Sequence, residues 1–197
     1  MADEHPEAFE KVGEPVRLDK MTAARRQLNS AIWLWFKEGD PASIHTLTGA
    51  AFGILDALYY RKFKRRPVPL NEVNMPEYLR PHAKKLRDLI SLSQDYLKHA
   101  RYDADESHDL PVGFTDHYIY GSIRAYRELN PGEWNQPLMS LFIVRFTAFF
   151  PELFGGIDKV APTDEKRRDI EHIKQLSRIE FFERVGGQFR HLPPIGN

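Results

Sequence analysis

Apolar side chains recur at steps of three and four residues along residues 21–60, and this spacing restricts the fold more than any other feature. Such a spacing places the side chains on one face of an α-helix. It predicts one helix from Asp19 to about Lys37 and a second from Pro41 to about Tyr60. Because the connection is so short, the two helices should form an antiparallel hairpin.

The connection itself carries recognisable helix signals. Gly39 is typical of a residue just after a helix end. Asp40 is a good N-cap, because its carboxylate can accept a hydrogen bond from a free backbone N–H of the first turn. Pro41 suits the first helical position, where an N–H would have had no partner. The stretch therefore predicts a helix stop followed at once by a helix start.

Further helical segments follow along the chain. They are predicted at residues 81–100, 115–129, 137–150 and 163–185. No run of alternating apolar and polar residues flanks a hairpin turn, so no strands are expected. The sequence predicts an all-α fold, a helical bundle of about four to five packed helices. Its domain organisation is predicted as a mobile N-terminal lead-in at 1–18, a single helical-bundle domain at 19–187 and a C-terminal tail at 188–197.

Composition excludes several classes of protein. The 197 residues include 28 basic and 28 acidic side chains, so no net charge draws the chain to nucleic acid or to an anionic membrane. There is no cysteine, and hence neither a disulfide nor a thiolate metal site. No stretch approaches 18 apolar residues, and the N-terminus lacks the apolar core of a signal peptide. We expect a soluble, cytoplasmic protein without a membrane contact. Motifs for common cofactors are absent, so none is predicted.

His45 is the first candidate functional residue. At 100° per residue it lies to one side of the main apolar stripe, beside Gly49 and Phe52. Gly49 and Gly53 disfavour a helix, a cost that is tolerated where another segment packs closely. One interpretation makes His45 a buried, hydrogen-bonded residue in a seam between helices. The other makes it a catalytic or ligand-binding group.

A second group of candidates lies near residue 100. Asp95, His99 and Asp103 are spaced by four, so they share one side of a helix if the helix continues that far. Two carboxylates and an imidazole could bind a divalent metal, or a carboxylate could orient the histidine as a general base. A charged stripe opposite the core is more often a solvated face, and no metal ligand set is assigned from the sequence.

Two elements of the sequence, GDPASIHTLTGAA and DYLKHARYD, resemble a widespread group of small bacterial helical proteins of uncharacterised function. The resemblance spans about residues 20–154, with FFPELF similar to the group's closing segment. Residues that match its recurring pattern are Asp40, Pro41, Ser43, Ile44, His45, Thr46, Leu47, Ala50, Ala51, Lys98, His99, Ala100 and Asp103. Asp95 stands where the group usually has asparagine. The resemblance implies a fold and, with the reasoning above, a candidate face made by His45, Asp95, Lys98, His99 and Asp103.

Helical bundles of this kind are also similar to HEPN domains, many of which are RNases with an Arg-x(4 to 6)-His motif. Three pairs here have that spacing, Arg101 with His108, Arg167 with His172 and Arg184 with His191. The many arginines and histidines of the chain would give about as many pairs by chance. The spacing therefore does not by itself indicate an RNase.

A cationic strip follows the second predicted helix. It consists of Arg61, Lys62, Lys64, Arg65 and Arg66. The negative end of the helix dipole favours cations at this position. The alternative is a phosphate-binding strip on which Phe63 stacks a base.

The sequence favours a binding or interaction module without established catalysis. Trp33 lies off the apolar stripe of its helix and indicates a surface for self-association, so a homodimer is predicted. The first alternative is a HEPN-like RNA-binding or RNA-cleaving protein that uses His99 and the cationic strip. The second is a metal-binding protein with carboxylate and histidine ligands.

Overall fold

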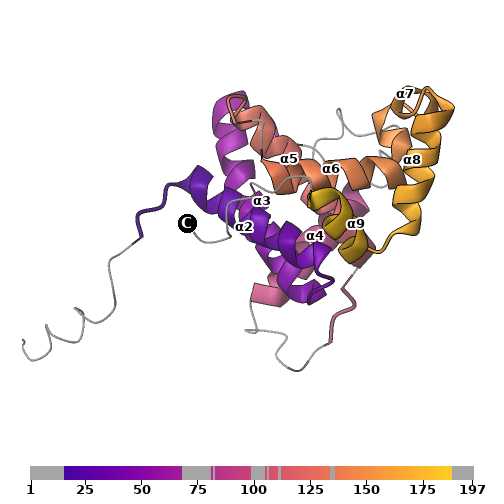
Figure 1. The fold of residues 1–197 in the computed structure, drawn as a ribbon. Coiled ribbons are helices and arrows are strands. Elements are labelled where there is room, and N and C mark those ends of the chain that lie inside the picture. The colour runs from indigo at the N-terminus through magenta and orange to yellow at the C-terminus, as the bar shows by residue number, and fades with distance from the viewer. Residues whose placement is uncertain are drawn as a thin grey trace, which may run out of the picture.

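The computed structural model describes residues 16–67, 81, 83–98, 105, 107–110, 112–133 and 136–187 (Figure 1). The helices in these ranges are α2 (Lys20–Phe36), α3 (Pro41–Phe63), α4 (Ala83–Lys98), α5 (Val112–Leu129), α6 (Pro137–Phe149), the 3-10 helix η3 (Pro151–Phe154), α7 (Ile157–Val160), α8 (Asp164–Gln175) and α9 (Arg178–Gly186). No strand occurs in the described part of the chain, which confirms the predicted all-α bundle. Most of the predicted lead-in and the whole predicted tail lie outside the described residues.

The helical hairpin forms as predicted, with α2 packed along α3. Both helices begin at an aspartate cap: Asp19 accepts a hydrogen bond from the backbone N–H of Thr22 at 2.8 Å, and Asp40 accepts one from Ser43 at 2.7 Å. Pro41 occupies the first turn of α3. These caps satisfy backbone donors that have no partner inside the helix.

The turn between α2 and α3 differs from the prediction in one respect. The left-handed residue is Glu38, with φ of 52°, and not Gly39. The N–H of Gly39 donates to the carbonyl of Leu34 at 2.9 Å, and the N–H of Glu38 donates to that of Trp35 at 3.3 Å. This is the hydrogen-bond pattern of a Schellman motif, whose left-handed position usually carries glycine. A glutamate there is strained, since its Cβ crowds the backbone.

The core lies between α2, α3, α5, α6 and α9. Its large, fully buried side chains are Leu28, Ile32, Phe36, Leu55, Tyr59, Ile119, Ile123, Tyr126, Phe142 and Phe181. In Figure 1, α7 and α8 lie at one edge of the molecule, beyond α6. The five helices that enclose the core agree with the predicted number.

The predicted helix over 163–185 is wrong, because the chain forms two helices there. Leu176 leaves the helical conformation with ψ of 140°, and Ser177 begins α9. Ser177 and Glu180 form a capping box, in which each side chain bonds the other residue's backbone N–H. The S-x-x-E spacing favours a new helix start over a continuous helix.

Arg145 holds this break in place. Its guanidinium is buried at the end of α6 and donates hydrogen bonds to the carbonyl oxygens of Ile173, at 3.3 Å, and Leu176, at 2.8 Å. The Ile173 carbonyl also accepts the backbone N–H of Leu176 at 3.3 Å, whereas the Leu176 carbonyl lies beyond the last turn of α8, where no further helical N–H is available. The one charged residue in the most apolar stretch of the sequence therefore joins α6 to the junction between α8 and α9.

Trp33 does not form an uncovered surface. Its ring meets Phe182 of α9 edge to face at 5.3 Å, and the Lys37 ammonium lies over both rings. The side chain lies off the main stripe because α9 packs on that side of α2. The homodimer stays a prediction, without this support.

Among the described helices, none is both long and apolar enough to cross a membrane.

The two glycines within α3 have different surroundings. A Cβ built on Gly49 would lie 2.5 Å from the side-chain nitrogen of Gln94, so α4 does pack closely there. The Gln94 amide, which would have to move, hydrogen-bonds the Tyr118 hydroxyl. A Cβ on Gly53 would meet nothing within 4 Å, and the expected close contact at that position is wrong.

We therefore predict opposite outcomes for two alanine substitutions. Gly53→Ala should raise stability by about 0.5–1 kcal/mol, because alanine favours a helix and nothing blocks the methyl group. Gly49→Ala should lose that gain, because the methyl group displaces the Gln94 amide. Chemical denaturation of the two variants measures the difference. Equal stabilisation by both would show that the packing of α4 on Gly49 is unimportant.

Candidate functional site

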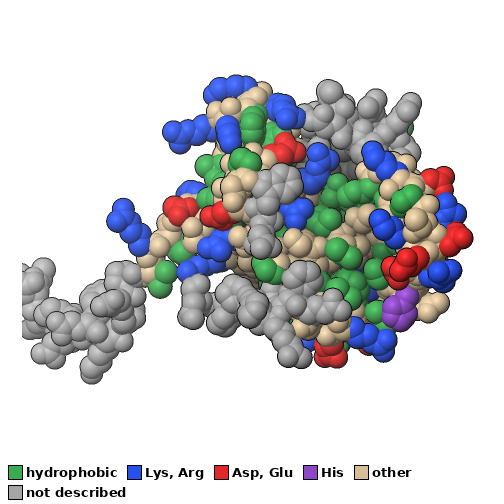
Figure 2. Space-filling view, turned by 45° about the horizontal axis from the view of Figure 1, so that its top comes forward, with side chains coloured by type: hydrophobic (Ala, Val, Ile, Leu, Met, Phe, Trp, Pro, Cys, Tyr) green, Lys and Arg blue, Asp and Glu red, His purple; other side chains and the backbone are tan. Residues whose placement is uncertain are grey.

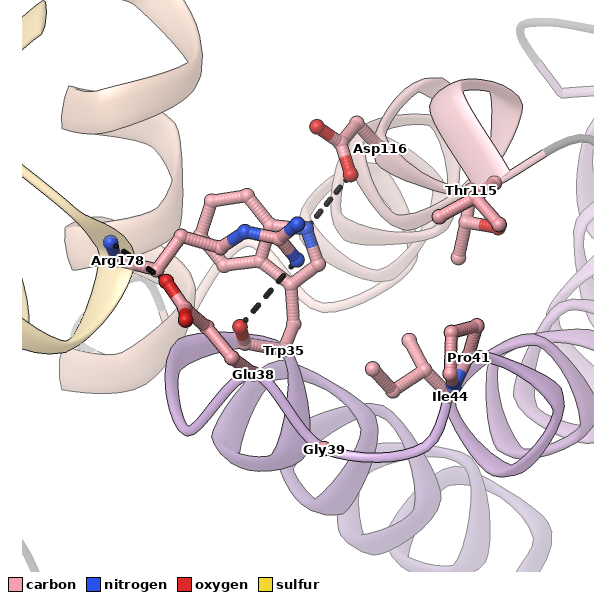
Figure 3. Close-up of a pocket in the computed structure, with 9 residues that line it drawn as sticks. Trp35, Glu38, Gly39, Pro41, Ile44, Thr115, Asp116 and Arg178 are labelled. Atoms are coloured by element: carbon pink, nitrogen blue, oxygen red, sulfur yellow. Dashed lines mark hydrogen bonds between the residues drawn. The ribbon is translucent and has the colours of Figure 1, made fainter.

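A pocket of about 360 Å³ lies where the turn between α2 and α3 meets the first turns of α5 and α9 (Figure 3). Its lining combines apolar side chains with two acids and one guanidinium. The lining residues are Trp35, Glu38, Gly39, Pro41, Ile44, Val112, Thr115, Asp116 and Arg178. In Figure 3, Pro41 and Ile44 lie on one side of the pocket, and Arg178 and Glu38 lie on the other.

Asp116 brings a carboxylate to this pocket from the core-facing side of α5. It precedes the fully buried Ile119 by three residues and Ile123 by seven, so the helical repeat turns it inward. The Trp35 indole N–H donates to Asp116 Oδ1 at 2.6 Å. Burial raises the pKa of Asp116, and the Trp35 hydrogen bond and the charge of Arg178 offset only part of that effect. Among the described residues, no donor reaches the second carboxylate oxygen.

Arg178 is the first residue of α9, and its guanidinium lies over the Trp35 ring, 4.8 Å from the centroid. One terminal nitrogen donates to the Trp35 carbonyl oxygen at 3.4 Å. Trp35 therefore contacts both charged groups, with its ring edge at Asp116 and its ring face at Arg178 (Figure 3). The two groups do not form an ion pair with each other.

Glu38 completes the charged side of the pocket. Its carboxylate accepts a hydrogen bond from the backbone N–H of Arg178 at 3.3 Å. The strained residue of the α2–α3 turn thus bonds to the start of α9. Backbone strain at a left-handed non-glycine residue is retained where its side chain makes a contact that glycine cannot make.

His45 lies behind the pocket wall. It is 1% exposed, and its Nδ1 is 3.2 Å from the hydroxyl oxygen of Thr115, which lines the pocket. Its other ring nitrogen is buried without a partner. Burial and, to a lesser degree, the charge of His108 lower the pKa of His45 to about 4. A charged ring would place a buried N–H without an acceptor, so His45 is neutral at pH 7.

The packing interpretation of His45 agrees with this environment. Its ring lies 5.5 Å from that of Tyr118, and Phe52 packs on the same tyrosine at 5.1 Å. His108 lies at the neighbouring seam between α4 and α5, where its Nε2 is 2.9 Å from the Ser93 hydroxyl. His45 thus belongs to a buried seam and reaches the pocket only through Thr115.

Of the other candidates of the predicted face, only Asp95 has a described side chain. Asp95 is exposed on α4, whereas His45 is buried. Lys98 ends α4, and its side chain lies outside the described residues, as do His99 and Asp103. Within the described ranges, no group of three or more potential metal ligands occurs. A shared face for these five residues stays a prediction.

The cationic strip lies at the end of α3, and three of its five charges contact the protein itself. Lys62 donates to the Leu129 carbonyl at 3.1 Å, Arg65 lies 3.7 Å from the Glu128 carboxylate, and Arg66 pairs with Asp56. Arg61 and Lys64 are exposed, and lysine and arginine side chains gather on the surface at this end of the molecule (Figure 2). Phosphate binding by Arg61, Lys62, Lys64, Arg65 and Arg66 stays a prediction, and these contacts leave fewer charges for it.

Sequence reasoning missed the charged side of the pocket. Asp116 could have been found from the sequence, because it lies on the helical face of α5 that carries the buried apolar residues, and an acid is unusual there. Arg178 gives no such signal, since it reaches Trp35 only because the chain breaks at Ser177. Further residues of the lining lie in the stretch from which the sequence predicts a helix stop and a helix start, namely Glu38, Gly39, Pro41 and Ile44.

Comparison of the chain with protein-family models, with curated proteins and with solved structures finds no match.

We predict that glycine substitutions at the two left-handed non-glycine residues differ in effect. Lys64, with φ of 57°, caps α3 and is exposed, so Lys64→Gly should raise stability by about 1 kcal/mol. Glu38→Gly relieves the same strain but loses the bond to Arg178, so its gain should be smaller or negative. Urea denaturation of both variants measures this. An equal gain at the two positions would mean that Glu38 contributes nothing to the docking of α9.

We also predict a stability loss in acid that depends on His45. The pKa of His45 is about 4 in the fold, against an ordinary value of 6.5, so the unfolded chain binds more protons between these pH values. The contribution is complete above pH 6.5 and is lost as the pH falls toward 4. It amounts to on the order of 3 kcal/mol.

The measurement is the free energy of unfolding at pH 7 and at pH 4.5. His45→Asn retains a side chain that can bond Thr115 but does not titrate, so its stability should fall less between the two pH values than that of the natural protein. His172→Asn, at an exposed position of α8, is the matched control and should leave the difference unchanged. If His45→Asn also leaves it unchanged, the buried imidazole does not set the acid sensitivity.

Proposed function

We propose that the protein is a binding module for a small molecule, without catalysis of its own, and that its site is the pocket between α2, α3, α5 and α9. The observation that supports this most is the pair of opposite charges, Asp116 and Arg178, that contact one indole without contacting each other. Burying a charge without a full partner is costly. A ligand that supplies the missing partners would remove part of that cost.

The size and lining of the pocket support the proposal. Ligand sites combine an apolar lining with a few polar groups that fix the orientation of the ligand, and they occupy about 300–1,000 Å³. The present pocket, at about 360 Å³, is at the small end of that range. It fits a small molecule rather than a chain segment.

The chemistry of the lining favours binding over catalysis. The Thr115 hydroxyl contacts His45, the arrangement of a nucleophile and a base. The His45 pKa of about 4, however, makes the imidazole a weak base at neutral pH. Its second nitrogen also has no carboxylate to orient the ring, since it has no hydrogen-bond partner. Thr115 is better explained as a wall residue that His45 positions.

The HEPN-like alternative uses the cationic strip to bind RNA. Three of the five charges of this strip already contact the protein itself, so the strip does not favour that alternative over the present proposal. His99, which that alternative uses, lies outside the described residues. RNA binding and cleavage, as well as a carboxylate and histidine metal site, therefore stay predictions from the sequence.

The test is to block the pocket with a bulky side chain. Val112 lines the pocket and is 45% exposed, so Val112→Trp should fill the space without removing a charge. Leu92, 59% exposed on α4 and not part of the pocket lining, gives the matched control Leu92→Trp. A panel of small amines, carboxylates and amino acids is screened by thermal shift against the three proteins.

We expect at least one compound to raise the melting temperature of the natural protein and of Leu92→Trp, but not of Val112→Trp. At a concentration of 100 times Kd, binding stabilises by about 2.7 kcal/mol, or roughly 5–10 °C for a chain of this length. A panel in which no compound binds, or in which Val112→Trp responds like the natural protein, would contradict the proposal.

A further inference from the structure

The charges of the pocket also indicate the kind of molecule that fits it. We propose that the pocket binds a zwitterion of the α-amino-acid type, with the ligand ammonium on Asp116 and the ligand carboxylate on Arg178. This inference rests on the proposed function, in which the pocket is the ligand site. The apolar side of the pocket would then receive the ligand's side chain.

The acidic end of this arrangement is Asp116. One of its oxygens accepts the Trp35 N–H, which leaves the other for a donor from the ligand. An ammonium offers three N–H donors and a full positive charge. A charge-assisted hydrogen bond of this kind is about twice as strong as one between neutral groups.

The cationic end is Arg178. Its guanidinium face rests on Trp35, and one terminal nitrogen is used by the Trp35 carbonyl. The remaining N–H donors have no acceptor among the described residues. A planar guanidinium with two free donors matches the two oxygens of a carboxylate. The backbone bond from Arg178 to Glu38 holds the start of α9 in the position that this requires.

The balance of charges favours a neutral zwitterion over a simple amine or a simple acid. Glu38 and Asp116 each use one carboxylate oxygen, for the Arg178 backbone N–H and for the Trp35 indole, and Arg178 uses one terminal nitrogen, so the lining offers both acceptors and donors to a ligand. A ligand with one charge would leave the opposite group unpaired in a partly buried site. The same indole separates the two groups, so a ligand must carry both charges a short distance apart.

The remaining surface of the pocket explains where an amino-acid side chain would lie. The apolar part of the lining consists of Pro41, Ile44 and Val112. Pro41 and Ile44 lie across the pocket from Arg178 (Figure 3). Apolar contact there favours an aliphatic side chain. A pocket of about 360 Å³ has room for one amino acid.

The experiment first measures binding of the twenty standard amino acids to the full-length protein by thermal shift. It then compares three probes by titration calorimetry: L-leucine, isoamylamine, which lacks the carboxylate, and 4-methylpentanoate, which lacks the ammonium. We expect an aliphatic amino acid to bind, and both leucine analogues to bind at least 10-fold more weakly than leucine.

Two variants assign the ends of the ligand. Asp116→Asn retains an acceptor for Trp35 and should weaken leucine binding at least 10-fold, while any weak binding of 4-methylpentanoate stays the same. Arg178→Gln should weaken leucine in the same way and leave isoamylamine unchanged. Arg184→Gln, exposed near the end of α9, is the control and should bind leucine like the natural protein.

The outcomes separate this inference from the proposed function. If isoamylamine or 4-methylpentanoate binds as tightly as leucine, the pocket recognises a single charge and the zwitterion is wrong. If none of the twenty amino acids binds but another compound does and is blocked by Val112→Trp, the zwitterion is wrong and the ligand site stands. If nothing binds, both are wrong.

Discussion

The hydrogen bond from the Trp35 indole to Asp116 is the interaction on which the arrangement of this protein depends. It joins the end of α2 to the start of α5 at 2.6 Å, in the layer where the aromatic core begins. The same ring packs on Phe36 and Phe142 and carries the Arg178 guanidinium on its face. A tryptophan is suited to this position because it offers a large apolar surface and one polar edge. Through it, the core and the pocket share a wall.

The hairpin could be predicted from the sequence because local signals specify it. The apolar repeat of α2 and α3, the Asp40 cap and Pro41 act within a few residues, and each appears in the structure at the expected place. The break between α8 and α9 also has a local signal, the capping box of Ser177 and Glu180. The apolar repeat continues on both sides of this break, and it therefore predicts one helix where the structure has two. A capping box outweighs a continuous repeat where the next helix must change direction.

The site could be predicted only in part, since its residues come from distant segments. The sequence predicts a helix boundary between Glu38 and Ile44, and residues of this segment line the pocket. Its partners, Asp116 and Arg178, meet it only through packing across 81 and 143 residues of sequence separation from Trp35. No spacing rule applies over such distances. For His45, by contrast, the sequence correctly predicts a position to one side of the main apolar stripe, and the structure shows that this side is a buried seam.

The contacts of Arg145 with the end of α8 have a consequence for molecular recognition. Because the carbonyls of Ile173 and Leu176 are tied to α6, the chain enters α9 from a fixed point, two residues before the Arg178 guanidinium. Ordering a long side chain on association costs roughly 0.5–1.5 kcal/mol. Arg178 is ordered when the protein folds, because its backbone N–H bonds Glu38 and its guanidinium stacks on Trp35. This entropy loss therefore occurs on folding, and a ligand of the proposed site would meet an arginine that is already ordered.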